Sequence, residues 1–307
     1  MTTKPEWMRG CATALVTPFK ADGAVDLPRM RALVERQVKG GVQLLVPCGT
    51  TGERATMSDE EGRQVVAATV EVARGRARVV AGAGSNNTAH AVEQAREAAK
   101  LGADGVLIVA PYYNKPTQDG LLAHFRAVAE AVAPLPVMMY NVPGRTSSNI
   151  QAATTLKLAR EVPNIAAIKE ASGDFAQIMA ILRERPAGFR VLSGDDAVTL
   201  PLMALGADGI VSVVSNEVPD LMARLADLAL AGKWDEARAL HYRLLPLMEV
   251  NFIESSPGPV KAAMAAMGLL EEHFRLPLVP VKEASRTRVR EVLASLALPG
   301  QRSDAAA

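Results

Sequence analysis

Eight short apolar segments, separated by longer amphipathic stretches, restrict the fold of this sequence more than any other feature. Each segment is apolar without strict alternation, which is typical of a strand buried on both faces. Strands that alternate with helices form a parallel sheet. Eight such units in about 220 residues predict an α/β chain with a (β/α)8, or TIM, barrel. The predicted strands are Ala12–Val16, Gln43–Val46, Arg78–Ala81, Gly105–Val109, Val137–Asn141, Ile165–Lys169, Arg190–Ser193 and Gly209–Val213.

Helical segments fill the spaces between these strands. The first opens with Ser58 and Glu61 at the spacing of a capping box. The second ends at Gly102, a residue type that commonly follows a helix. Leu-Gly-Ala-Asp-Gly precedes both the fourth and the eighth strand, which indicates either a half-barrel repeat or one favourable turn used twice. The predicted helices are Ser58–Ala73, Thr88–Leu101, Gln118–Val132, Thr154–Glu161, Phe175–Arg185 and Ala197–Leu205.

The alternation stops after Leu230, where Ala231-Gly-Lys-Trp234 marks a break. Beyond it the sequence predicts only helices, at Asp235–Val250, Pro259–Leu269 and Lys282–Leu296. We therefore divide the chain into a catalytic barrel, residues 1–230, and a C-terminal helical domain, residues 231–307. The small and polar end, Gly300–Ala307, is predicted to be disordered.

Charge and composition argue against several classes of function. The chain has 34 Lys and Arg against 33 Asp and Glu, a net charge of +1, so no general positive charge attracts nucleic acid or membranes. Its two cysteines, Cys11 and Cys48, fit a reducing compartment. Met1–Gly10 lacks the apolar core of a signal peptide, and no apolar run approaches the ~20 residues of a membrane span. We therefore expect a cytoplasmic protein that binds neither nucleic acid nor membrane.

Polar residues that could perform chemistry follow the predicted strands. Active sites of TIM barrels lie at the C-terminal ends of the strands. Three of the four tyrosines lie in these segments although aromatic residues make up only 4% of the chain, so packing alone does not explain them. The segments are Gly49–Glu53, Pro111–Pro116, Tyr140–Thr146, Ile168–Ala171 and Ser193–Asp196.

Lys169 is the strongest catalytic candidate because it ends an apolar strand at the barrel mouth. Burial favours the neutral amine over the ammonium, and a neutral amine can form a Schiff base with a carbonyl group. The alternative is a lysine that extends to solvent or pairs with Glu170. Tyr140, one strand earlier, favours the catalytic role because a phenol can shuttle protons. Thr50 and Thr51 suit a small carboxylate, although an ordinary glycine-rich turn is the alternative.

Cofactor and metal motifs are weak in this sequence. Gly82–Asn87 lacks the third glycine of a dinucleotide fingerprint, and no phosphate loop is present. The histidines, at positions 90, 124, 241 and 273, have no metal-binding spacing. Asp195 and Asp196 could indicate a metal, but we favour Asp196 as the N-cap of the next helix. Cys48 is interpreted as a small buried thiol.

Together these segments resemble the dihydrodipicolinate synthase and N-acetylneuraminate lyase family of class I pyruvate aldolases, and within it most closely the dihydrodipicolinate synthases. The resemblance runs from Ala14-Leu-Val-Thr-Pro18 to Pro257-Gly-Pro-Val-Lys261. Five motifs in order carry it, each at a predicted strand end: Gly49-Thr-Thr-Gly-Glu53, Pro111-Tyr-Tyr-Asn114, Tyr140-Asn-Val-Pro-Gly-Arg-Thr146, Ile168-Lys-Glu-Ala171 and Ser193-Gly-Asp-Asp196.

The resemblance implies a role for each motif. Lys169 condenses with pyruvate, and Tyr140, Thr51 and Tyr113 form a proton relay, with Tyr113 reaching a neighbouring subunit. Thr50 and Thr51 hold the pyruvate carboxylate, and Arg145 holds the carboxylate of L-aspartate 4-semialdehyde. Gly194 and Val211 line the site. The resemblance also implies a homotetramer built from two dimers, no metal or organic cofactor, and a product that enters lysine and diaminopimelate biosynthesis.

Arg145 is the residue that indicates the second substrate, because a guanidinium binds a carboxylate through two parallel hydrogen bonds. The alternative is a surface arginine on a turn. Two positions depart from relatives that bind L-lysine as a feedback inhibitor: His90 replaces an acidic residue, and Arg54 replaces a small one. Asn86 and Tyr112 match. Inhibition by lysine is therefore not expected. The loop Thr146-Ser-Ser148 also lacks the glycine that commonly follows Arg-Thr.

Two rival functions remain open from the sequence. One is a relative that uses the same pyruvate imine with another aldehyde, such as an aldolase that acts on a sugar acid. The other is a barrel that binds a keto acid without turnover, which the complete set of lysine, tyrosine and threonine disfavours.

Overall fold

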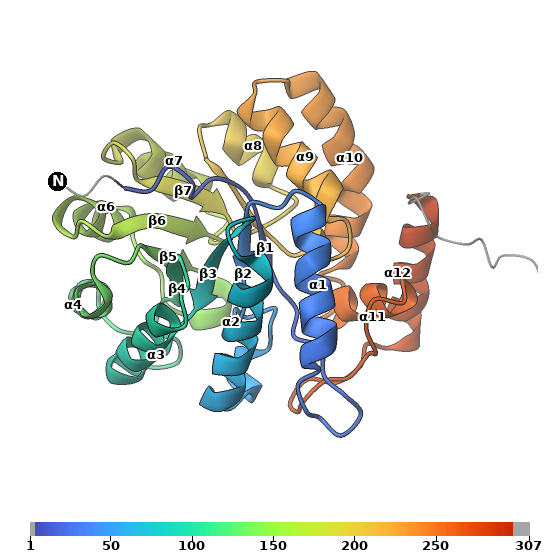
Figure 1. The fold of residues 1–307 in the computed structure, drawn as a ribbon. Helices are drawn as coiled ribbons and strands as arrows, with labels where there is room; N and C mark the ends of the chain where they lie inside the picture. The colour runs from blue at the N-terminus through green and yellow to red at the C-terminus, as the bar shows by residue number, and fades with distance from the viewer. Residues whose placement is uncertain (1–3, 297–307) are drawn as a thin grey trace, which may run out of the picture.

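The computed structural model describes residues 4–296 and closes eight strands into one barrel. Every neighbouring pair runs parallel, and β8 pairs with β1. Figure 1 shows the strands at the centre with helices around them. The predicted (β/α)8 barrel is therefore confirmed. The strands are β1 Gly10–Ala14, β2 Leu44–Val46, β3 Arg78–Gly82, β4 Gly105–Val109, β5 Val137–Asn141, β6 Ile165–Glu170, β7 Arg190–Ser193 and β8 Gly209–Ser212.

Helices connect the strands and cover the outside of the barrel. The six helices that the sequence predicts between strands are present with small shifts at their ends. Their observed bounds are α2 Asp59–Ala73, α3 Thr88–Lys100, α4 Gln118–Val132, α6 Ala152–Glu161, α7 Phe175–Glu184 and α8 Thr199–Ala204. The structure adds α1 Leu27–Lys39, α9 Pro219–Leu230, the short α5 Pro143–Thr146 and two 3-10 turns, η1 Arg54–Thr56 and η2 Val214–Asn216.

Local capping signals explain where several helices begin. The capping box of α2 is confirmed: the Ser58 hydroxyl accepts from the Glu61 amide at 3.2 Å, and the Glu61 carboxylate accepts from the Ser58 amide at 2.9 Å. Asp26 accepts from the Arg29 amide, and a proline occupies the first turn of α1. This pattern of an acidic cap followed by proline is the signal in the sequence that identifies α1.

The prediction that Asp196 caps a helix is wrong. Helix α8 begins after Val198, without a side-chain cap. The buried Asp196 carboxylate instead accepts from the Ser212 hydroxyl at 2.5 Å and from the Val213 and Val214 amides at 2.9 and 3.3 Å. Burial raises its pKa to about 6 although these donors oppose the rise. Asp196 takes these partners because closure of the barrel brings the amides at the end of β8 next to its carboxylate.

The core has an inner layer and an outer layer. Inward-facing side chains such as Leu44, Leu107 and Met138 fill the barrel interior. Outward-facing residues such as Leu45, Ile108 and Ile168 pack against the helices. Because successive side chains of a strand point to opposite faces, this division decides which strand residues can reach the site at the barrel mouth.

The C-terminal helices gather at one side of the barrel, as the orange and red segments of Figure 1 show. They are α10 Trp234–Val250, α11 Gly258–Ala266 and α12 Glu283–Ser295. Val260 and Met264 of α11 pack with Val16 and Val213 near the strand ends. The division at residue 230 stays a prediction, and Gly300–Ala307 lies outside the described residues. In the described part of the chain, no helix has the length and apolarity needed to cross a membrane.

Candidate active site at the barrel mouth

Strand β6 directs Lys169 into the barrel. Ala167 belongs to the inner layer and Ile168 to the outer one, so alternation turns Lys169 inward. Its side chain is buried, and Nζ lies 4.2 Å from the ring centre of Tyr140, which neighbours it in register on β5. Within residues 4–296, Lys169 makes no ion pair. The structure therefore places an amine against a phenol at the mouth of the barrel.

Pairing of Lys169 with Glu170, the alternative from sequence, is wrong. Glu170 lies on the opposite face of β6 and accepts from the Asn141 amide at 3.1 and 3.2 Å and from Gln177 at 3.4 Å. Burial raises its pKa. Successive side chains of a strand point to opposite faces, so the side chains of Lys169 and Glu170 point away from each other.

Gly194, at the end of β7, leaves room for the Lys169 side chain. A Cβ atom at position 194 would lie 2.9 Å from Lys169 Cε and 2.8 Å from the Ala171 Cβ. The Gly194 amide also donates to the Glu170 carbonyl at 2.8 Å. Val211 of β8 is buried in the inner layer. Gly194 thus borders the lysine directly, and Val211 lies in the same inner layer of the barrel.

Residues 49–53, here called the threonine loop, follow β2. Two turns shape it: the Gly52 amide donates to the Gly49 carbonyl, and the Glu53 amide donates to the Thr50 carbonyl, both at 3.1 Å. Thr51 is buried and Thr50 is exposed. Because a Cβ at Gly52 would lie 2.9 Å from the Leu15 carbonyl oxygen, the loop fits closely against the chain that leaves β1.

A cavity of about 520 Å³ opens at this end of the barrel. It brings together Thr50, Tyr140 and Arg145 of the predicted set, with Tyr112 beside them. Arg145 lies on the short α5 and makes no ion pair within residues 4–296, so its guanidinium is available to an anion. Such a cavity, with a cation and hydroxyl groups converging on it, suits a small anionic ligand.

Tyr113 does not line this cavity. It is 88% exposed and adopts a left-handed φ of 73°. Its side chain contributes to no core cluster of the described chain. Its exposure is compatible with the role in a neighbouring subunit that the sequence resemblance implies.

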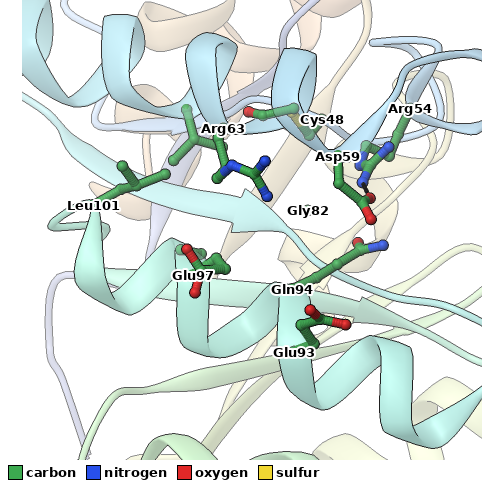
Figure 2. A pocket seen from close by; sticks show the side chains of 12 residues that line it. Cys48, Arg54, Asp59, Arg63, Gly82, Glu93, Gln94, Glu97 and Leu101 are labelled. Atoms are coloured by element: carbon green, nitrogen blue, oxygen red, sulfur yellow. Dashed lines mark hydrogen bonds and ion pairs between the residues drawn. The ribbon is translucent and has the colours of Figure 1, made fainter.

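A smaller hollow of about 40 Å³ lies between α2 and α3. Figure 2 shows Arg54 and Asp59 pointing toward each other, with Gln94, Glu93 and Glu97 on the facing helix. Arg54 donates to Asp59 at 2.5 Å and to the Met57 carbonyl at 2.8 Å, and His90 lies 3.2 Å from the same carboxylate. The hydrogen bond from Arg54 lowers the pKa of Asp59.

Two charged residues near the site receive no role from the sequence. Glu53 ends the threonine loop, and Lys261 ends the motif that opens α11; both side chains are fully buried. Lys261 Nζ donates to Glu53 Oε1 at 2.6 Å. Each of these two motifs consists otherwise of apolar or small residues. The single charged residue in each is the signal from which their pairing could have been predicted. Cys48, just before the loop, is the buried thiol that the sequence predicts.

Comparisons with known proteins agree with this geometry. The model of the dihydrodipicolinate synthetase family matches residues 7–296. The 4-hydroxy-tetrahydrodipicolinate synthase of Koribacter versatilis is 54% identical over 288 residues, which cover 94% of this chain and 95% of the relative.

Solved structures are similar over the same length. Dihydrodipicolinate synthase from Aquifex aeolicus has a TM-score of 0.93 and 44% identity, and the match covers 95% of this chain and 99% of that one. The chloride-inhibited enzyme of the same name from Acinetobacter baumannii, solved as a complex with pyruvate, has a TM-score of 0.92 and 42% identity, with 94% and 99% covered.

Proposed function

The chain belongs to the dihydrodipicolinate synthetase family, and on that premise we propose that it is a Schiff-base lyase. It condenses pyruvate with L-aspartate 4-semialdehyde to 4-hydroxy-tetrahydrodipicolinate, in lysine and diaminopimelate biosynthesis. The observation that carries the proposal is the inward-facing Lys169, in contact with Tyr140 beside a cavity that Arg145 and Thr50 line.

Lys169 supplies the covalent chemistry. Its neutral amine attacks the keto carbon of pyruvate, and loss of water leaves an imine. The imine withdraws electrons, so the pyruvate methyl group releases a proton and becomes a nucleophilic enamine. The enamine carbon then bonds to the aldehyde carbon of the second substrate. The amino group of that substrate replaces Lys169 at the imine carbon, which closes the ring and frees the enzyme.

Tyr140, Thr51 and Tyr113 move the protons that these steps require. The carbonyl oxygen must gain protons to leave as water, and the phenol of Tyr140 lies beside the lysine that it serves. Thr50 and Thr51 bind the pyruvate carboxylate through hydroxyl and backbone N–H groups. Gly194 and Val211 complete the wall of the site.

Arg145 binds the carboxylate of the semialdehyde, because its guanidinium has no competing acidic partner within residues 4–296. This assignment favours aspartate semialdehyde over the aldehyde partners of sugar-acid aldolases, which carry no carboxylate. Steady-state assays with pyruvate and aspartate semialdehyde, run beside N-acetylneuraminate and 2-keto-3-deoxygluconate, test it directly. Turnover of either sugar acid at a higher kcat/KM would contradict the proposal.

The reaction needs no metal or organic cofactor, because the imine of Lys169 supplies the electron sink that a cofactor would otherwise provide. We further propose a cytoplasmic enzyme that assembles as a homotetramer of two dimers. Support for the assembly comes from Tyr113, whose exposed side chain is free to complete the relay of a partner subunit.

Mixed dimers test the placement of Tyr113. Lys169→Ala and Tyr113→Phe subunits are each expected to be nearly inactive alone. When they are mixed, one site regains Lys169 from one chain and Tyr113 from the other, so part of the activity returns. Verified hybrids without any recovery would place Tyr113 in the site of its own subunit.

A further inference from the structure

We infer that the buried Glu53–Lys261 pair positions the threonine loop for binding of the keto-acid carboxylate, so that the C-terminal helices take part in pyruvate binding. The inference rests on the function proposed above. Neither residue touches the reacting atoms, and each acts through the loop as a positioning residue.

Lys261 is enclosed by partners that suit an ammonium group. Its three protons meet three acceptors: Glu53 Oε1 at 2.6 Å, the His273 carbonyl at 2.6 Å and the Thr17 carbonyl at 3.1 Å. The rings of Phe19 and Phe274 each lie 4.7 Å from Nζ. The site is therefore built to hold a charged lysine in one place.

Glu53 transmits this fixed position to the threonine loop. Its backbone adopts a left-handed φ of 55°, a conformation that a non-glycine residue occupies only when its surroundings impose it. Its amide donates to the Thr50 carbonyl, so the backbone that the ion pair holds also closes the turn that carries Thr50 and Thr51.

Thr17 joins the same two parts of the chain by a second route. Its carbonyl accepts from Lys261, and its hydroxyl donates to the Gly52 carbonyl at 2.7 Å. Lys261 is thus connected to the threonine loop at two neighbouring residues. A movement of the ammonium group shifts both Gly52 and Glu53.

The charges of the pair oppose the effect of burial. Burial raises the pKa of Glu53 and lowers the pKa of Lys261, and each partner counters the shift of the other. Loss of one partner leaves the other buried without its main countercharge. The remaining side chain then moves or becomes neutral, and the threonine loop loses the contact that holds it in place.

The expected kinetic consequence is specific. The threonine loop serves the carboxylate of pyruvate, whereas Arg145 on α5 serves that of the semialdehyde. Disturbing the pair should therefore raise the KM for pyruvate and leave the KM for the semialdehyde unchanged. A pair that only stabilised the fold would not separate the two values.

Glu53→Gln is the main test, because it keeps the size and one acceptor of the side chain but removes its charge. We expect the KM for pyruvate to rise about tenfold. The pyruvate concentration that gives half-maximal borohydride trapping should rise by the same factor. Asp208→Asn is the matched control: this carboxylate pairs with Arg185 and Arg190 at the opposite end of the barrel, so both KM values should stay at the wild-type level.

The double variant Glu53→Gln with Lys261→Met protects the test against misfolding, since it buries no unpaired charge. It should also show the raised KM for pyruvate. Wild-type KM values in folded Glu53→Gln or in the double variant would overturn the inference, and so would an equal rise in both KM values. If the unaltered protein traps no pyruvate, the proposed function itself fails.

Discussion

Lys169 and Lys261 are both buried lysines near the same end of the barrel, but their surroundings differ. Lys261 Nζ has three acceptors, one of them the Glu53 carboxylate of its ion pair, whereas Lys169 makes no ion pair within the described chain and contacts the ring of Tyr140. An ammonium held by three acceptors has no lone pair to offer, whereas a Schiff base requires an amine that no acidic partner holds. The two lysines therefore differ in their partners and not in their burial.

Replacing the reactive lysine should have the largest effect. Lys169→Arg is expected to lower kcat more than about a thousandfold, because a guanidinium stays protonated and cannot form an imine. Borohydride with pyruvate should leave an adduct on Lys169 of the wild-type protein. Peptide mapping that finds the adduct on Lys261 would reverse the comparison between the two lysines.

Removing Lys261, whose ammonium group is fully hydrogen-bonded, should mainly affect stability. Lys261→Met leaves the Glu53 carboxylate buried without its cation, which is expected to lower the free energy of unfolding by about 3–5 kcal/mol. Denaturant titration measures the loss. A change below about 1 kcal/mol would mean that water reaches the pair, since exposed pairs contribute only that much.

Arg145 is a third cation for this comparison. It lines the cavity and has no acidic partner in the described residues. Arg145→Ala should raise the KM for aspartate semialdehyde about ten- to a hundredfold, the range expected for hydrogen bonds to a charged group. The KM for pyruvate should change little. Equal effects on both substrates would show that Arg145 braces its loop instead of binding substrate.

His124 shows what burial does to a base that makes no ion pair within residues 4–296. Burial lowers its pKa from 6.5 to about 4, although Thr88 lies within hydrogen-bonding distance. Between about pH 6.5 and pH 4, His124 is therefore protonated in the unfolded chain but neutral in the folded chain. The free energy of unfolding falls as the pH is lowered through this interval.

We expect this histidine to contribute about 1–3 kcal/mol of acid sensitivity over that interval. His124→Gln should flatten the decline in denaturation midpoints between neutral and mildly acidic pH. His273→Gln, at a partly exposed position beside Glu271, serves as the control for the substitution itself. If both variants showed the same dependence of the denaturation midpoint on pH, the acid sensitivity would have to come from groups other than His124.

Arg54 and Asp59 predict the smallest effect, which is weak or absent inhibition by L-lysine. Arg54 and His90 both lie against the Asp59 carboxylate, so a ligand ammonium would compete with the Arg54 guanidinium for it. Titration of L-lysine at subsaturating pyruvate should leave the rate unchanged. Cooperative inhibition at sub-millimolar lysine would contradict this expectation, and Asp59→Asn would then show whether that carboxylate binds the ligand.

The regular pattern of the sequence determined the barrel. Apolar strands of the right length, capping signals such as Ser58 with Glu61, and the positions of polar motifs at strand ends are local features, readable without the fold. The same period of two that makes Ala167 an inner residue also turns Lys169 inward. For this reason the candidate lysine and its neighbour Tyr140 could be predicted from sequence alone.

Tertiary structure alone decided which charges meet. Glu53 and Lys261 are 208 residues apart, and Asp196 meets the Val213 amide only where β7 and β8 lie side by side. A local pattern carries no information about such partners, because burial and hydrogen bonding depend on surfaces that exist only after the barrel closes. The sequence therefore identified Lys169 as the candidate amine, whereas folding decided which other charged groups pair with one another around it.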